Sequence, residues 1–100
     1  MVQRKGKTWV ETSVPEFLEL SAEDIVIVEF RAALALALQR ARKRRKITQE
    51  EAAESIGTSQ AQVSKMEAGV ASVTLDRMIK ALTALGVPRR TIVRALKNAA

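Results

Sequence analysis

Residues 48–69 contain two helix-start signals in close succession, and each is followed by a glycine. A hydroxyl residue with an acid or amide three positions later can satisfy the free backbone N–H groups of a helix start. Glycine favours the left-handed backbone conformation that ends many helices. The two sets are Thr48 with Glu51 and Gly57, and Ser59 with Gln62 and Gly69. This spacing predicts two short helices joined by a turn of about three residues.

Three further helix starts are visible, at Ser21 (paired with Asp24), at Thr74 and at Pro88. Because no Gly or Pro occurs between Ser21 and Gly57, the first helix is expected to be long and to cover residues 22–45. The composition is rich in helix formers such as Ala, Leu, Glu, Lys and Arg. Together these features predict an all-α, five-helix domain over residues 21–100 with an extended N-terminal helix.

Residues 1–20, ahead of this domain, are expected to form a partly disordered N-terminal arm with a basic start. Within it, residues 9–20 combine β-branched side chains with Pro15, which favours an extended segment followed by a helical turn. The β-branched run at residues 25–28 leaves a strand open as the alternative to the start of the first helix.

Composition and charge narrow the range of functions. The chain has no Cys and no His, so we expect no metal site, no cofactor and no imidazole or thiolate catalysis, which makes an enzyme the least favoured class. Its formal charge is +6, but six acidic and no basic residues lie from Glu11 to Glu29, whereas six of the seven residues from Arg40 to Lys46 are basic. The net positive charge and its concentration in one segment favour an anionic partner. No apolar run resembles a signal peptide or a membrane span, so we expect a cytoplasmic protein without membrane contact.

The first predicted helix carries more apolar residues than one buried face requires. The apolar side chains of residues 25–38 are spread over more than one side of the helix, whereas a surface helix needs a single apolar stripe. We therefore expect a second copy of the chain or another protein to cover part of it. The residues assigned to this dimer or partner surface are Ile27, Phe30, Leu34, Leu36, Ile92, Val93 and Leu96.

Two short helices joined by a tight turn and followed by two more helices form the layout of a helix-turn-helix DNA-binding unit. The elements TQEE, GTSQ, VSKMEAG and ALG occur in this order between residues 48 and 86. With residues 38–47 they make the chain resemble the Cro/cI (Xre) family of bacterial and phage regulators, whose core motif falls on residues 48–69 of this sequence. The sequence departs from that pattern at Ala52, where many members have Leu, and at Lys65, where many have Arg.

The resemblance implies that the third helix reads bases. Gln60, Ala61 and Lys65 correspond to the usual base-reading positions, and Ser64 shares their side of the helix. Gln can bond adenine through two atoms, Lys can reach guanine, and an Ala methyl can touch the thymine methyl. A solvated helix face is the alternative for these side chains. Gln62 is interpreted as bonding back to the start of its own helix, with a base contact as the alternative.

Other positions correspond to DNA-backbone contacts or to the fold itself. In the family, the counterpart of Gln49 touches a phosphate and buttresses the reading helix, while the counterparts of Arg42 and Glu67 form a buried ion pair. Further phosphate contacts are expected from Thr48, Ser59, Arg40, Lys43, Arg44 and Lys46. The basic run could instead only solvate the end of the first helix, where cations interact with free carbonyl groups.

The resemblance implies a sequence-specific transcriptional regulator of bacterial or phage origin, associated with the nucleoid. The favoured form is a homodimeric repressor that binds a palindromic operator in double-stranded DNA through its third helix. The stretch FLELSAED at residues 17–24 and the TSQ of residues 58–60 also resemble stand-alone antitoxins of the HigA kind. Such antitoxins bind a RelE- or HigB-like ribonuclease toxin and repress their own operon. The acidic segment would then suit a small basic toxin, and both hypotheses remain open.

Overall fold

The computed structural model describes residues 21–99, and all regular structure in that range is helical. The five helices are α1 (Ala22–Arg44), α2 (Gln49–Ile56), α3 (Gln60–Ala68), α4 (Leu75–Ala84) and α5 (Arg89–Ala99). The prediction of an all-α, five-helix fold is confirmed. The strand alternative at residues 25–28 is wrong, because these residues lie inside α1. The expected arm at residues 1–20 lies outside the described residues.

Side-chain caps begin the first four helices. At Ser21 and Thr48 the capping box is complete, since the hydroxyl accepts a backbone hydrogen bond and the acid three residues later accepts one in return. At Ser59 only the first half forms: its hydroxyl accepts from the backbone N–H of Gln62 at 3.2 Å, and the Gln62 side chain closes no box. The hydroxyl of Thr74 caps α4 in the same way.

The end of α1 differs from the ends of α2 and α3. Gly57 and Gly69 terminate those two helices with φ of 86° and 67°, the left-handed region that glycine adopts without strain. After α1 the left-handed position is occupied by Lys46, with φ of 59°. The turn is held by a backbone hydrogen bond from the N–H of Ile47 to the carbonyl of Arg42 at 3.3 Å. A residue with a Cβ therefore occupies a conformation that suits glycine better.

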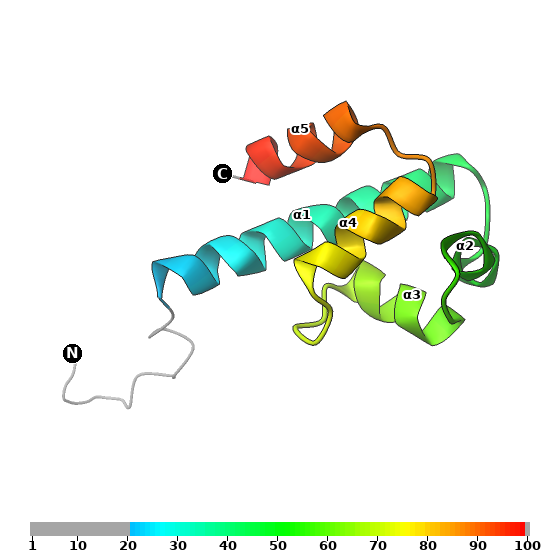
Figure 1. The fold of residues 1–100 in the computed structure, drawn as a ribbon, viewed down its shortest axis with the longest axis horizontal. Coiled ribbons are helices and arrows are strands. Elements are labelled where there is room, and N and C mark those ends of the chain that lie inside the picture. Colours follow the sequence, from blue (N-terminus) through cyan, green and yellow to red (C-terminus); the bar gives the residue numbers. More distant parts are fainter. Residues whose placement is uncertain (1–20, 100) are drawn as a thin grey trace.

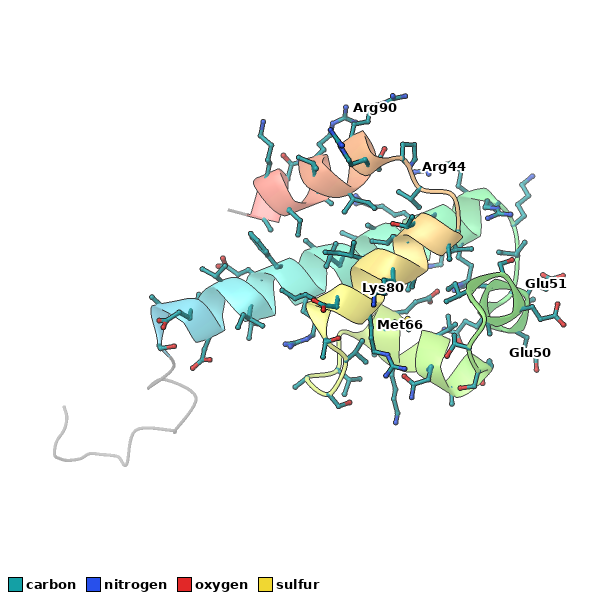
Figure 2. The ribbon with its side chains drawn as sticks, in the orientation of Figure 1. Arg44, Glu50, Glu51, Met66, Lys80 and Arg90 are labelled. Carbon is teal, nitrogen blue, oxygen red and sulfur yellow. The ribbon has the colours of Figure 1, made fainter. Side chains whose placement is uncertain are left out.

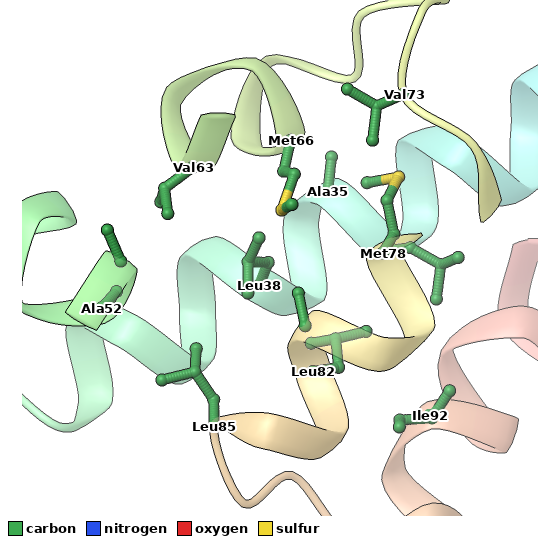
Figure 3. Packing of buried hydrophobic residues seen from close by; sticks show 13 residues of the cluster. Ala35, Leu38, Ala52, Val63, Met66, Val73, Met78, Leu82, Leu85 and Ile92 are labelled. Atoms are coloured by element: carbon green, nitrogen blue, oxygen red, sulfur yellow. The ribbon is translucent and has the colours of Figure 1, made fainter. Parts of the chain in front are cut away.

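The hydrophobic core lies where α1, α3 and α4 meet, and α5 packs along α1 beside α4 (Figure 1). Helix α2 packs on α3 and, less extensively, on α4. Ala52 of α2 and Leu85 at the end of α4 belong to the same cluster (Figure 3). The largest fully buried side chains are Leu34, Leu38, Val63, Met78 and Leu82. Helix α1 thus serves as the long element against which three of the other four pack.

The structure corrects the expected partner surface. Leu34 is completely buried and Ile92 is 7% exposed, and both belong to the chain's own core. Leu96 is half-buried and packs against that core, and Phe30 is half-buried as well. The first prediction failed for Leu34 and Ile92 because the sequence does not show which stripe of α1 and α5 the core will use.

The N-terminal part of α1 extends beyond the other helices (Figure 1). There the four consecutive residues 25–28 are 39 to 51% exposed, although all of them are Ile or Val. Leu36 and Val93, at 43% and 47%, are the other members of the expected surface that remain exposed with Ile27. None of the helices in residues 21–99 combines the length and the apolar character needed to cross a membrane.

Replacing Lys46 by Gly is expected to stabilise the fold by about 1 kcal/mol, because Gly removes the strain of a left-handed residue that carries a Cβ. The free energy of unfolding in urea measures this effect. Lys46→Ala is the control, since it removes the same charge and keeps the Cβ. The interpretation is wrong if the Gly variant is no more stable than the Ala variant.

Candidate nucleic-acid interface

Helix α3 is fixed on one side and free on the other. Val63 is completely buried and Met66 is 3% exposed, so they attach the helix to the core. The opposite edge consists of the side chains that the sequence assigns to base reading, and all are exposed: Gln60, Ala61, Ser64 and Lys65. The edge carries one amide, one hydroxyl, one ammonium group and a methyl group, which together can donate, accept and make apolar contact.

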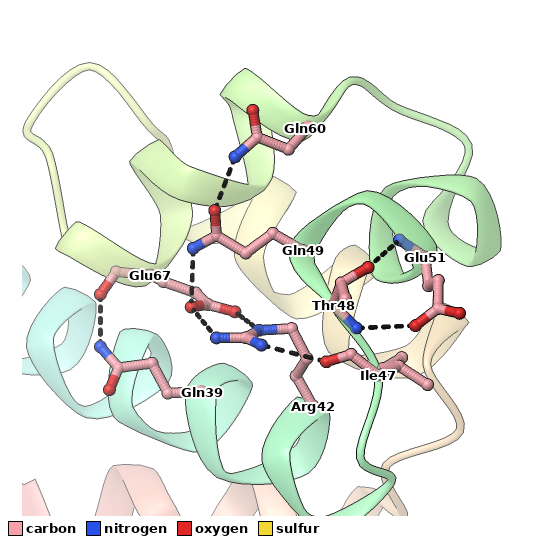
Figure 4. Close-up of polar contacts among 8 residues, drawn as sticks. All are labelled: Gln39, Arg42, Ile47, Thr48, Gln49, Glu51, Gln60 and Glu67. Atoms are coloured by element: carbon pink, nitrogen blue, oxygen red, sulfur yellow. Dashed lines mark hydrogen bonds and ion pairs between the residues drawn. The ribbon is translucent and has the colours of Figure 1, made fainter.

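An ion pair joins the end of α1 to the end of α3 (Figure 4). Arg42 Nε donates to Glu67 Oε2 at 2.5 Å, and Arg42 Nη2 donates to Glu67 Oε1 at 3.0 Å. The third guanidinium nitrogen of Arg42 donates to the backbone carbonyl of Ile47 at 3.0 Å. This parallel, two-bond geometry fixes orientation as well as distance. The Glu67 side chain is 7% exposed, so little water competes for the pair.

Two glutamines also bind Glu67. Gln39 Nε2, from α1, donates to the Glu67 backbone carbonyl at 2.7 Å. Gln49 Nε2, at the start of α2, donates to Glu67 Oε1 at 3.1 Å. Sequence reasoning missed Gln39, although it lies three residues before Arg42 and therefore on the same side of α1. Three helices thus meet at one residue of α3 (Figure 4).

The network continues to the exposed edge and has a defined direction. A carboxylate can only accept hydrogen bonds, so Gln49 must turn its Nε2 towards Glu67. Its Oε1 is then left to accept from Gln60 Nε2, at 2.7 Å. Consequently the Oε1 of Gln60, together with the second N–H of its Nε2, stays available outside the network. The orientation of the Gln60 amide thus follows from the charge of a residue at the other end of α3.

Both members of the ion pair are charged at neutral pH. Burial by itself raises the pKa of Glu67, but hydrogen bonds from Arg42 and Gln49 and the positive charges of Arg42 and Lys43 outweigh it, so the pKa lies below its ordinary value. The hydrogen bond to Glu67 raises the pKa of Arg42 against the smaller opposing effect of desolvation. The network is therefore intact at neutral pH.

The basic run at the C-terminal end of α1, residues 40–46, does not act as one unit. Arg42 is committed to Glu67, and Arg45 Nη1 donates to the carbonyl of Leu85 at 2.7 Å, which ties the end of α1 to the end of α4. The sequence did not distinguish Arg45 from its neighbours, because its partner is 40 residues away. Arg45 is nevertheless exposed, as are Arg40, Lys43, Arg44 and Lys46, which make no such bond to another helix within residues 21–99. In Figure 2, Arg44 projects from the end of α1, and Arg90 projects from the start of α5.

Replacing Glu67 by Gln is expected to destabilise the fold at pH 7 by about 1–3 kcal/mol, because Arg42 keeps its desolvation and loses its counter-charge. The pKa of Glu67 is lowered by folding, so its contribution is complete above the unfolded pKa of about 4.3 and is lost as the pH falls through the lower folded pKa. Urea unfolding at pH 7 and near pH 3 should show the difference between parent and variant shrink at low pH. A difference that does not change with pH would contradict the assignment.

A family model described as a helix-turn-helix, HTH_3, matches residues 38–92, which is more than half of the chain. The matched range begins inside α1 and includes α2, α3, α4 and the start of α5. It therefore includes the Arg42–Glu67 pair and the exposed edge of α3. The chain has no significant match among curated proteins or among solved structures. The match and the fold support a DNA-binding regulator, and the chain belongs to the Cro/cI-type (Xre) helix-turn-helix family.

Proposed function

We propose that this chain is a sequence-specific transcriptional repressor that binds a palindromic operator as a homodimer, with α3 in the major groove. The observation that carries the proposal is the division of α3 into a fastened side and a free polar edge. Hydrogen bonds and an ion pair from α1 and α2 orient the helix, while Gln60, Ala61, Ser64 and Lys65 remain exposed. A helix held this rigidly can present side chains to base edges with little further loss of backbone freedom on binding.

The direction of the hydrogen-bond network favours adenine opposite Gln60. Bidentate recognition of adenine needs an acceptor for the N6 amino group and a donor for N7. The free Oε1 and the second N–H of Gln60 supply this combination. The ammonium group of Lys65 can donate to guanine O6 and N7, and the Ala61 methyl suits a thymine methyl. We propose these three contacts as the sequence-reading set, with Ser64 as an additional donor or acceptor.

Phosphate contacts are proposed around the edge of α3. An open depression beside the start of α2 is lined by Arg42, Thr48, Gln49, Glu50 and Gln60. The N-terminus of α2 carries partial positive charge there, and Gln49 retains one amide N–H beyond its bond to Glu67. Thr48, Ser59 and the exposed cations Lys43, Arg44 and Lys46 add further donors. Each phosphate neutralised adds about 0.9 to the slope of log affinity against log salt.

The test begins with duplexes selected from random DNA by the parent protein. We expect an inverted repeat whose half-sites lie about one helical turn, 10 bp, apart. On that site, Gln60→Ala with Lys65→Ala should weaken binding at least about 30-fold, since two bidentate contacts of about 1–3 kcal/mol each amount to about 2–6 kcal/mol. Binding isotherms at fixed salt measure the loss.

Lys97→Ala is the matched control, because it removes one exposed cation from the last turn of α5. It should change affinity only slightly. The assignment of α3 fails if the folded double variant binds the selected site as tightly as the parent does. Selection of a site without inverted symmetry contradicts the dimeric repressor instead.

A second candidate function is that of an antitoxin, and the exposed start of α1 favours it. Residues 25–28 offer four apolar side chains beyond the body of the domain. Glu23, Asp24 and Glu29 surround them, and no basic residue occurs between Ser21 and Arg31. An apolar patch with an acidic rim suits a basic protein partner. We propose that this partner is a small ribonuclease toxin of the RelE or HigB type, which the chain neutralises while it represses its own operon.

Co-purification of the tagged chain from its native host tests the antitoxin role. We expect a small basic protein to copurify with the parent and to be lost from the Ile27→Glu variant. This protein should inhibit translation when it is expressed alone. Ile79→Glu on α4 is the control, because Ile79 is similarly exposed at 37%. Recovery of the parent without such a protein, under conditions in which the chain is abundant, removes this second function.

A further inference from the structure

One face of α1 is left open by the rest of the domain. Helical spacing places seven residues on it: Ile25, Glu29, Ala32, Ala33, Leu36, Arg40 and Lys43. Leu36, the central apolar residue of this face, is 43% exposed. Arg40 and Glu29, on either side of it, are exposed as well, and Ala33 is half-buried. Within residues 21–99 no other helix covers this face.

Two shallow grooves place Leu36 at the middle of the face. One groove lies between α1 and α5, with Ala33 and Ala37 on one wall and Ala95 on the other. The second lies between α1 and α3, with Ala32 on one wall and Ala68 on the other. Leu36 lines both grooves. It therefore stands as a ridge between α5 on one flank and α3 on the other, with small side chains next to it on both sides.

The negative and positive charges of this face lie at opposite ends of it. Glu29 lies on the N-terminal side of the apolar centre, and Arg40 and Lys43 lie on the C-terminal side. Counted along the helix, Glu29 precedes the midpoint between Ala33 and Leu36 by as many residues as Arg40 follows it. A second α1 laid antiparallel on this face would place Leu36 against Ala33 and Glu29 against Arg40. A parallel arrangement would instead place like charges opposite each other, which is unfavourable.

We propose that this open face of α1 is the homodimer interface, formed by antiparallel packing of α1 on α1 of a second copy. The inference rests on the proposed function, because it specifies the surface that the dimeric repressor uses. The two-fold axis of such a pair passes through the interface, perpendicular to both helices. This axis lies within the interface plane, so rotation about it keeps each flank of α1 on the same side of the dimer. Both α3 helices therefore lie on one side and both α5 helices on the other. A palindromic site requires this placement of two reading helices.

The proposal predicts a charge-reversal pattern that is measured without DNA, by sedimentation equilibrium of the full chain. The parent should dimerise. Glu29→Arg and Arg40→Glu should each weaken the dimer about tenfold, because each creates two like-charge pairs. The combination of both substitutions restores opposite charges across the interface and should return the dimer to near parental strength. Leu36→Glu should weaken it at least about 100-fold, since it places a charge in the apolar centre.

Ile79→Glu is the control, because it adds the same charge at a similarly exposed apolar position on α4. It should leave the dimer unchanged, and helical content by circular dichroism identifies any variant that fails to fold. A monomeric parent, a Leu36→Glu variant as dimeric as the parent, or a double reversal no stronger than the single reversals overturns the interface. If the reversal pattern holds but no DNA site is selected, the interface stands and the proposed function falls. If a palindromic site is selected but the charge-reversal pattern is absent, the proposed function stands and the α1 interface falls.

Discussion

The arrangement of the site depends on the carboxylate of Glu67. It accepts two hydrogen bonds from Arg42 and one from Gln49, and its backbone carbonyl accepts one from Gln39. Through these bonds α1 and α2 both hold the end of α3. A charge this deeply buried is tolerated only with such partners, and removal of one partner leaves the other desolvated without compensation. The same carboxylate, acting through Gln49, determines which atoms of Gln60 stay outside the network, so the position of α3 and the exposed edge of α3 both depend on the charge of Glu67.

Helix α1 links the core of the domain to both of the proposed protein-binding surfaces. Its C-terminal half packs into the core and supplies Arg42 and Gln39 to the network, while Arg45 ties it to the end of α4. Its N-terminal part extends into solvent with exposed Ile and Val side chains. A helix this long can hold the domain together and still offer surface to other molecules. The charge pattern along the open face of α1 is therefore the basis of the dimer proposal, and the acidic rim at its start is the basis of the antitoxin proposal.

Much of the fold could be predicted from local signals. The caps at Ser21, Thr48, Ser59 and Thr74 and the glycines at 57 and 69 placed four helix starts and two helix ends, because these signals act within a few residues. The Gln62 side chain was expected to bond back to the start of α3, but only its backbone N–H bonds to Ser59. The bonds of Arg45 to Leu85 and of Gln39 to Glu67 were not predicted, since their partners lie 40 and 28 residues away.

The sequence by itself determined that residues 21–99 are helical, where the helices begin, and which polar side chains share the exposed edge of α3, because capping, helical period and residue chemistry are local properties. The tertiary structure decided which apolar stripe of each helix is buried. Leu34 and Ile92, which were expected on the partner surface, lie in the core, whereas Leu36 and Val93 are exposed. The tertiary structure also decided the direction of the Glu67–Gln49–Gln60 chain of hydrogen bonds. Both outcomes depend on how separate helices pack, and a helical period cannot choose among several apolar faces of one helix.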